Sequence, residues 1–83
     1  MSVYPNPVHG SFTLNYDLGN GSGNGEVIVY NTLGAVVLRQ HLNSGDKSTK
    51  VESGSWAHGI YFLSVERNGV RVGSGKVVVR QAH

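Results

Sequence analysis

The chain alternates between apolar and polar positions over several short stretches, as strands with one buried face do. Residues 11–17 show this best: Phe12, Leu14 and Tyr16 share one face, and polar residues lie between them. Residues 26–30 are apolar on both faces, which is typical of a central strand. The same reasoning predicts further strands over 35–42, 47–52, 60–67 and 76–80. No stretch shows a convincing helical period.

The clearest hairpin turns at Asn68-Gly69, between the apolar stretches 60–67 and 70–72. Both turn residues accept positive φ at low cost, so the pair predicts a two-residue type I′ turn. Counting back from this turn places Glu66 opposite Arg71 and Val65 opposite Val72.

Continued without interruption, that register would put Lys76 on the core side of the sheet, because side chains alternate strictly along a strand. A slip of one residue removes the conflict, and the glycines of 73–75 lie where it is needed. We therefore predict a bulge or strand break at Gly73-Ser74-Gly75. Beyond it, Val77 and Val79 are expected to point inward, and Lys76, Val78 and Arg80 outward.

Glycine, proline and asparagine mark the connections between the strands. Pro5 and Pro7 have no backbone N–H, so residues 3–7 predict an edge segment that enters a kinked turn closed by His9-Gly10. Residues 31–34 predict a type I turn, with Gly34 left-handed and a bulge beside it. Residues 43–46 predict another turn. The glycine-rich stretch 19–25 lacks the lysine and Ser/Thr of a phosphate-binding loop, so we interpret it as a connection.

Six or seven short strands with glycine-rich turns indicate an all-β fold, an antiparallel β-sandwich of immunoglobulin-like type. We expect residues 1–83 to form one domain, without an internal repeat. Trp56 is the only tryptophan. It is expected to plug one end of the core, with its indole N–H directed at a carbonyl.

The composition argues against several classes of function. A formal charge of +2 without a concentrated basic face argues against nucleic acid as a partner. No apolar run approaches the ~20 residues of a membrane span, and the first residues do not resemble a signal peptide. The chain has no cysteine, so disulfides and thiol chemistry are absent.

The ionisable residues do not form a reactive set. The histidines (His9, His41, His58 and His83) lack the spacing of zinc ligands, and the carboxylates lie singly on turns and outward strand positions. No nucleophile elbow surrounds Ser74. We therefore expect no metal site, no cofactor and no enzymatic activity.

Three sets of residues together resemble the C-terminal sorting domain of proteins exported by the type IX (Por) secretion system of Bacteroidetes. Pro5-Asn6-Pro7 with Gly10 is similar to the family's opening motif. Residues 29–38, which contain Gly34, are similar to its middle motif. Gly59 to Val65, which include Tyr61, and Lys76 to Arg80 are similar to its closing motifs. Trp56 stands where leucine is usual in the family.

The resemblance implies a β-sandwich that acts as a sorting signal rather than as an enzyme. In the family the outer-membrane export machinery recognises the domain, and a sortase-like protease then removes it by cleavage at or before residues near Ser2. The cargo crosses the periplasm and reaches the cell surface or the medium.

We expect the machinery to contact the last strand, Lys76, Val77, Val78, Val79 and Arg80, which could add to a receptor's sheet by β-augmentation. The alternative for this strand is that it only completes the core. The alternative function is a carbohydrate-binding or adhesion sandwich attached to a secreted enzyme. Exposed edge strands also make a homodimer plausible.

Overall fold

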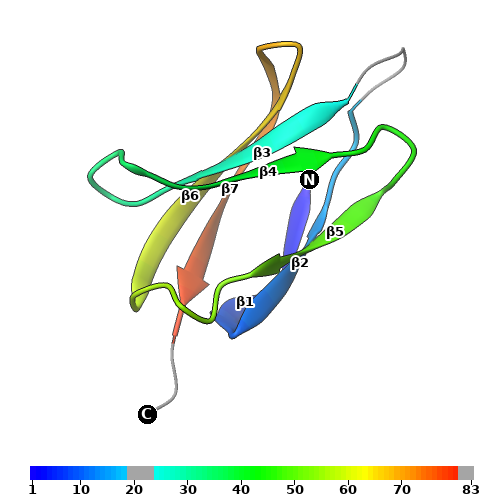
Figure 1. The fold of residues 1–83 in the computed structure, drawn as a ribbon. Coiled ribbons are helices and arrows are strands. Elements are labelled where there is room, and N and C mark those ends of the chain that lie inside the picture. Colours follow the sequence, from blue (N-terminus) through cyan, green and yellow to red (C-terminus); the bar gives the residue numbers. More distant parts are fainter. Residues whose placement is uncertain (19–23, 81–83) are drawn as a thin grey trace.

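The computed structural model describes residues 1–18 and 24–80, with the backbone alone at 5–9. Seven strands form two layers that face each other (Figure 1), and no helix occurs in the described part of the chain. The predicted all-β sandwich is therefore confirmed. The strands are β1 (Ser2–His9), β2 (Ser11–Asn15), β3 (Gly25–Tyr30), β4 (Val36–Leu42), β5 (Ser48–Glu52), β6 (Gly59–Arg67) and β7 (Val70–Val79).

One layer contains four antiparallel strands in the order β4-β3-β6-β7, and the other contains β1, β2 and β5. β1 joins the two layers along one side of the molecule. Its first residues, Ser2 to Tyr4, pair with β2, and Val8 then pairs in parallel with Val79 of β7. The ladder to β2 is irregular between Tyr4 and His9, where two prolines lack the N–H that it would need. The predicted kinked segment is thus a strand that changes partners.

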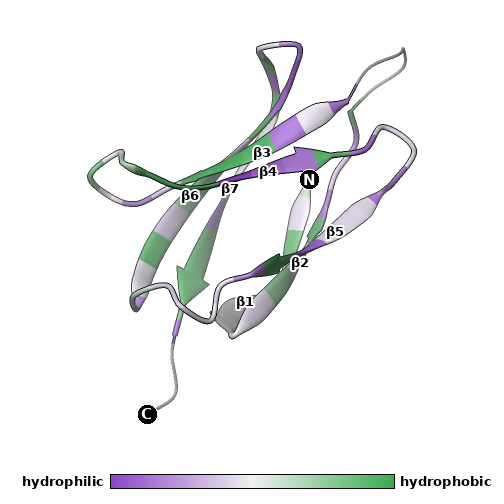
Figure 2. Ribbon diagram, viewed as in Figure 1, coloured by the Kyte–Doolittle hydropathy of each residue, from purple (hydrophilic) through white to green (hydrophobic). Residues whose placement is uncertain are grey.

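The core lies between the layers and is made by the inward positions of each strand. The alternation predicted for β2 is confirmed, since Phe12, Leu14 and Tyr16 are buried. β3 is a central strand as predicted, with Val27 and Val29 in the core. Figure 2 shows a continuous hydrophobic stretch along β3 and bands of different hydropathy along β6. The remaining core residues are Leu18, Leu42, Val51, Tyr61, Leu63, Val65, Val77 and Val79.

The turn between β3 and β4 has the predicted geometry. The Asn31 Oδ1 atom accepts hydrogen bonds from the backbone N–H of Leu33 (2.9 Å) and of Ala35 (3.0 Å), which closes the turn. Gly34 has a φ of 83°, a conformation that a residue with a Cβ adopts only at a cost. The register of the two strands shifts next to this turn, so the predicted bulge is confirmed as well.

The hairpin of β6 and β7 confirms most of its prediction and corrects one part. Asn68 (φ 53°) and Gly69 (φ 80°) form the left-handed turn, and Glu66 lies opposite Arg71. Val65, however, lies opposite Gly73 and not opposite Val72, because the register shifts directly after the Glu66 pair. The bulge therefore falls at Val72, one residue before the predicted glycines, and the strand does not break.

Gly73 and Gly75 face inward, and their missing side chains leave room for Met1. A Cβ added at Gly75 would lie 2.7 Å from the Met1 Cε atom. The bulge still exchanges the faces as predicted, because Val77 and Val79 are buried while Lys76 and Arg80 are exposed. The connection predicted over 19–25 lies mostly outside the described residues, and Gly25 already belongs to β3.

Candidate functional site

The glycines of the resemblance gather at one end of the sandwich, although they are far apart in the sequence. Gly10 (φ 82°) closes the turn from β1 to β2, Gly34 closes the turn from β3 to β4, and Gly59 begins β6. Gly59 pairs with Val79, the last residue of β7. We call this the closing end: residues 9–11, 30–36, 53–62 and 76–80. Figure 1 shows the arrowhead of β7 there, beside the turn that follows β1.

The opposite end contains the β6–β7 turn, and we call it the hairpin end: residues 15–18, 24–25, 43–47 and 67–72. Ser2 pairs with Asn15 there, so the chain enters the fold at the end where the glycines of the resemblance are absent. The two ends are separated along the long dimension of the molecule, which is 44 Å.

Aromatic packing fills the closing end. The Trp56 ring lies 5.9 Å from the Phe12 ring in an edge-on arrangement and 5.0 Å from the Tyr61 ring. The Tyr61 hydroxyl donates a hydrogen bond of 2.6 Å to the Ala57 carbonyl. Trp56 is partly buried against the core, so its predicted position at one end is confirmed. A carbonyl partner for its indole N–H stays a prediction.

The last strand differs between its two sides. β6 pairs with β7 along its whole length, whereas β1 meets it at the closing end, where Val8 lies opposite Val79. Among the described residues, the other edge of β7 has no neighbouring strand near the hairpin end. β1 therefore covers the backbone edge of β7 next to the predicted contact residues. The edge is open along the half of β7 that contains Gly73 and Gly75.

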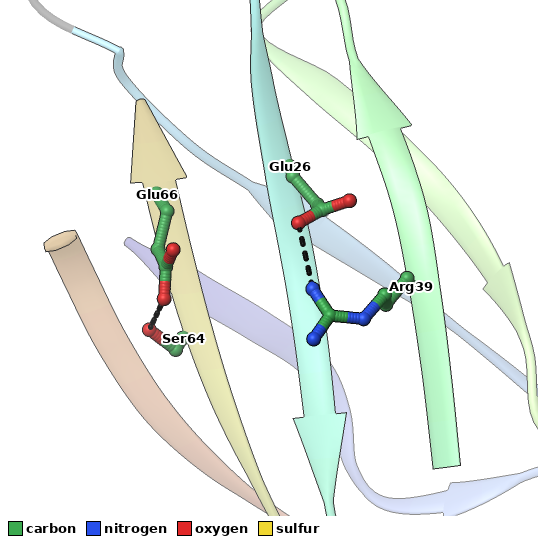
Figure 3. A network of polar contacts seen from close by, with 4 residues as sticks. All are labelled: Glu26, Arg39, Ser64 and Glu66. Carbon is green, nitrogen blue, oxygen red and sulfur yellow. Dashed lines mark hydrogen bonds and ion pairs between the residues drawn. The ribbon is translucent and has the colours of Figure 1, made fainter. Parts of the chain in front are cut away.

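The outer face of the four-stranded sheet carries two carboxylates. Glu26 and Glu66 lie toward the hairpin end, on the outer face of the four-stranded sheet. Figure 3 shows Glu26 beside Arg39 (3.1 Å) and Glu66 beside the Ser64 hydroxyl, which donates to it over 3.5 Å. The Arg39 pair is exposed and contributes little to stability.

One side chain at the hairpin end has a shifted pKa. Burial, together with the nearby charge of Asp46, raises the pKa of the Tyr16 hydroxyl, which outweighs its hydrogen bond to the Asn43 carbonyl (3.1 Å). Since Tyr16 packs in the core and donates to a backbone carbonyl, its role is structural.

No group of three or more His, Asp or Glu side chains in residues 1–18 and 24–80 lies close enough to hold a metal ion. In the same residues, no helix is long and apolar enough to cross a membrane.

The sequence profile of the family described as "Secretion system C-terminal sorting domain" matches residues 2–80. The chain belongs to this family. It is therefore a sorting signal of type IX secretion, and the resemblance drawn from the motifs is confirmed. A search of curated proteins gave no match.

Membership of the family determines several broader properties. A sorting domain interacts with the type IX machinery and directs export through the outer membrane, to the cell surface or the medium. The family is not an enzyme family. Family membership does not identify the residues that the machinery binds.

The structure brings together most of the residues singled out from the sequence. Gly10, Gly34, Gly59 and Tyr61 line or adjoin the closing end, as do the last residues of β7. It also reveals exposed apolar side chains that the sequence reasoning missed, Ile60 and Phe62 of β6. The only signal for them was that residues 60–63 are apolar on both faces.

Proposed function

We propose that residues 1–83 act as one export-signal unit, and that the type IX machinery reads the closing end, with Lys76, Val77, Val78, Val79 and Arg80 at its centre. The observation that carries this proposal is the convergence of Gly10, Gly34 and Gly59 on the end where β7 finishes. Alternate connections of antiparallel strands lie at the same end, so these turns and the last residues of β7 form one continuous surface that a partner can contact.

The two alternatives for the last strand, completion of the core and contact with the machinery, apply to different residues. Val77 and Val79 complete the core, while the outward side chains of Lys76 and Arg80 are exposed on the surface. Addition of a receptor strand to this part of β7 requires the end of β1 to move, because Val8 occupies that edge. Recognition through outward side chains needs no such movement, so we favour it.

The position of the N-terminal residues supports the proposed removal by a sortase-like protease after passage through the periplasm. Met1 is 45% exposed, and Ser2 is the first residue of β1. A cargo that precedes Met1 would join the hairpin end, so the closing end would point away from it. The machinery could then hold the signal while the protease cuts near Ser2.

Other functions have less support. A sugar platform needs several coplanar exposed aromatic rings, but Trp56 packs against Phe12 and Tyr61. A metalloenzyme would need converging ligands, and no group of three or more His, Asp or Glu side chains that could hold a metal gathers among the described residues. A homodimer through the edge strands β4 or β5 stays a hypothesis, and sedimentation of the purified chain tests it.

A fused reporter tests the proposal. We expect a periplasmic reporter carrying this chain to reach the surface of a host with type IX secretion, and deletion of residues 76–83 to abolish its appearance there. A deletion that left export intact would rule out the signalling role of the last strand. Because the deletion also removes Val77 and Val79, circular dichroism must show whether the shortened chain folds.

A charge variant keeps the core and separates signalling from folding. Lys76→Gln combined with Arg80→Gln leaves both buried valines in place, and we expect it to reduce export while the melting temperature changes little. The matched control is Lys47→Gln with Lys50→Gln, which removes the same charge elsewhere. Equal export of the two variants would contradict recognition through the closing end.

A further inference from the structure

Apolar side chains are exposed together on the outer face of the four-stranded sheet, at the closing end. Ile60 is 41% exposed, Phe62 44% and Val36 47%. The register brings them together, because Tyr30 lies opposite both Phe62 and Val36. Leu33, at the tip of the adjoining turn, is 91% exposed. We call Tyr30, Leu33, Val36, Ile60 and Phe62 the outer patch.

Exposed apolar side chains are concentrated at the outer patch and are not spread evenly over the surface. Among the described residues, the other large apolar side chains that are exposed, apart from the adjacent Val37, are Met1, Tyr4, Val70 and Val72. Met1 precedes β1, Tyr4 lies on it, and the two valines lie on the half of β7 near the hairpin end. Contiguous exposed apolar groups on a soluble domain are typical of an interaction site.

The surface at the outer patch is hollowed on two sides. A depression of ≈ 400 Å³ is lined by residues 31–33 and 57–61, and it includes Leu33 and Ile60. A second depression of ≈ 340 Å³ is lined by Tyr30, Phe62 and Lys76, among others. Both are open, so they fit protruding side chains of a partner protein better than an enclosed small molecule.

The charges around the outer patch indicate what kind of partner fits. Lys76 lies opposite Phe62 in the ladder, and Arg80 follows the end of β7. The carboxylates of the same face, Glu26 and Glu66, lie toward the hairpin end. Glu52 belongs to the other layer and lies 3.3 Å from Lys50. The outer patch therefore has a basic border.

A second copy of the chain is a poor occupant. In a two-fold interface each copy presents the same patch, and none of its five residues is a carboxylate, so Lys76 and Arg80 would meet no opposite charge there. A partner with an apolar surface bordered by carboxylates has complementary charge. We infer that the outer patch docks a protein of this kind, which, on the proposed function, is a component of the export machinery.

The test uses threonine, which removes the apolar surface and still favours a strand. Ile60→Thr with Phe62→Thr is expected to reduce surface export of the fused reporter about tenfold, as the loss of a central apolar contact pair does. The matched control is Val70→Thr with Val72→Thr, exposed at the hairpin end, for which we expect export at the wild-type level. Thermal melting should show that both variants fold.

A second arm tests the charge. Lys76→Glu is expected to lower export, because it places a like charge against the carboxylates of the partner. Lys47→Glu is the control, since it makes the same charge change at the hairpin end. Equal export of these two variants would overturn the basic border as a determinant.

The outcomes separate the inference from the proposed function. If the wild-type fusion stays inside the cell, the proposed function fails. If the wild-type fusion is exported and the Ile60→Thr, Phe62→Thr fusion is exported equally well, only the docking surface is overturned. Sedimentation of the purified chain completes the test, because a dimer that these substitutions abolish would assign the outer patch to a second copy and also overturn the inference.

Discussion

The two ends of the sandwich are stabilised by different interactions. At the closing end, Val77 and Val79 fill the core and Trp56 packs against two aromatic rings. Each end has a tyrosine that donates to a backbone carbonyl, Tyr61 to Ala57 (2.6 Å) and Tyr16 to Asn43 (3.1 Å). The hairpin end adds the hydrogen bond from Arg67 to the Leu18 carbonyl (2.8 Å). Packing should therefore contribute more to stability at the closing end, and the hydrogen bond of Arg67 and the protonation of Tyr16 should contribute at the hairpin end.

This difference fits a division of roles. β7 runs from one end to the other, and near the hairpin end it contributes glycines and exposed side chains to the fold. Near the closing end it contributes two buried valines and an outward basic face. The end that we propose is recognised is thus also the end where the last strand is most firmly packed. A folded signal could then be read without being opened.

The largest effect should come from the closing half of β7. Val77→Ala and Val79→Ala each remove two buried carbons and leave a cavity, so we expect each to lower the free energy of unfolding by about 2 kcal/mol. Urea denaturation measures the loss. Val72→Ala is the matched variant on the other half, and its expected change is below about 0.5 kcal/mol. Similar losses on both halves would contradict the contrast within the strand.

An intermediate effect is expected at the hairpin end. Arg67→Met keeps the aliphatic stem but leaves the Leu18 carbonyl without this donor, which should cost about 1.5 kcal/mol in the free energy of unfolding. The control is Arg39→Met, which removes only the exposed ion pair with Glu26 and should cost below about 0.5 kcal/mol. Equal losses for the two variants would show that the Leu18 contact adds nothing.

The smallest effect concerns alkaline pH. The pKa of Tyr16 is raised in the folded state, so its contribution is complete below the unfolded value of 10.0 and is lost as the pH rises through the folded value. Tyr16→Phe should therefore lose less stability than the wild type between neutral pH and pH values above about 10. Melting temperatures across this range measure it. An identical alkaline loss in both proteins would contradict the assignment to Tyr16.

Local chemistry made much of the fold predictable. Asn68-Gly69 and residues 31–34 carry turn preferences that act within a few residues, and the alternation in β2 reports directly which face is buried. Both features hold in the structure. The exchange of faces in β7 was also predictable, because an inward Lys76 would be a buried charge.

Features of the fold that depend on long-range contacts could not be predicted from the sequence. The bulge falls at Val72 because Glu66 pairs with Arg71 and the glycines lie beneath Met1, a residue far away in the sequence. The change of partner along β1 depends on where β7 ends in space. The exposure of Ile60 and Phe62 depends on whether another element covers that face, which the residues of one strand cannot reveal.

The most direct measurement compares the same short Gly-Ser insertion in two turns of the four-stranded sheet. One insertion separates Asn68 from Gly69 at the hairpin end, and the other separates Thr32 from Leu33 at the closing end. Lengthening a surface turn costs little in chain entropy, so both chains should fold, which circular dichroism checks. We expect the first fusion to reach the cell surface and the second to remain inside. The opposite pattern, or equal export of both folded fusions, would contradict the account.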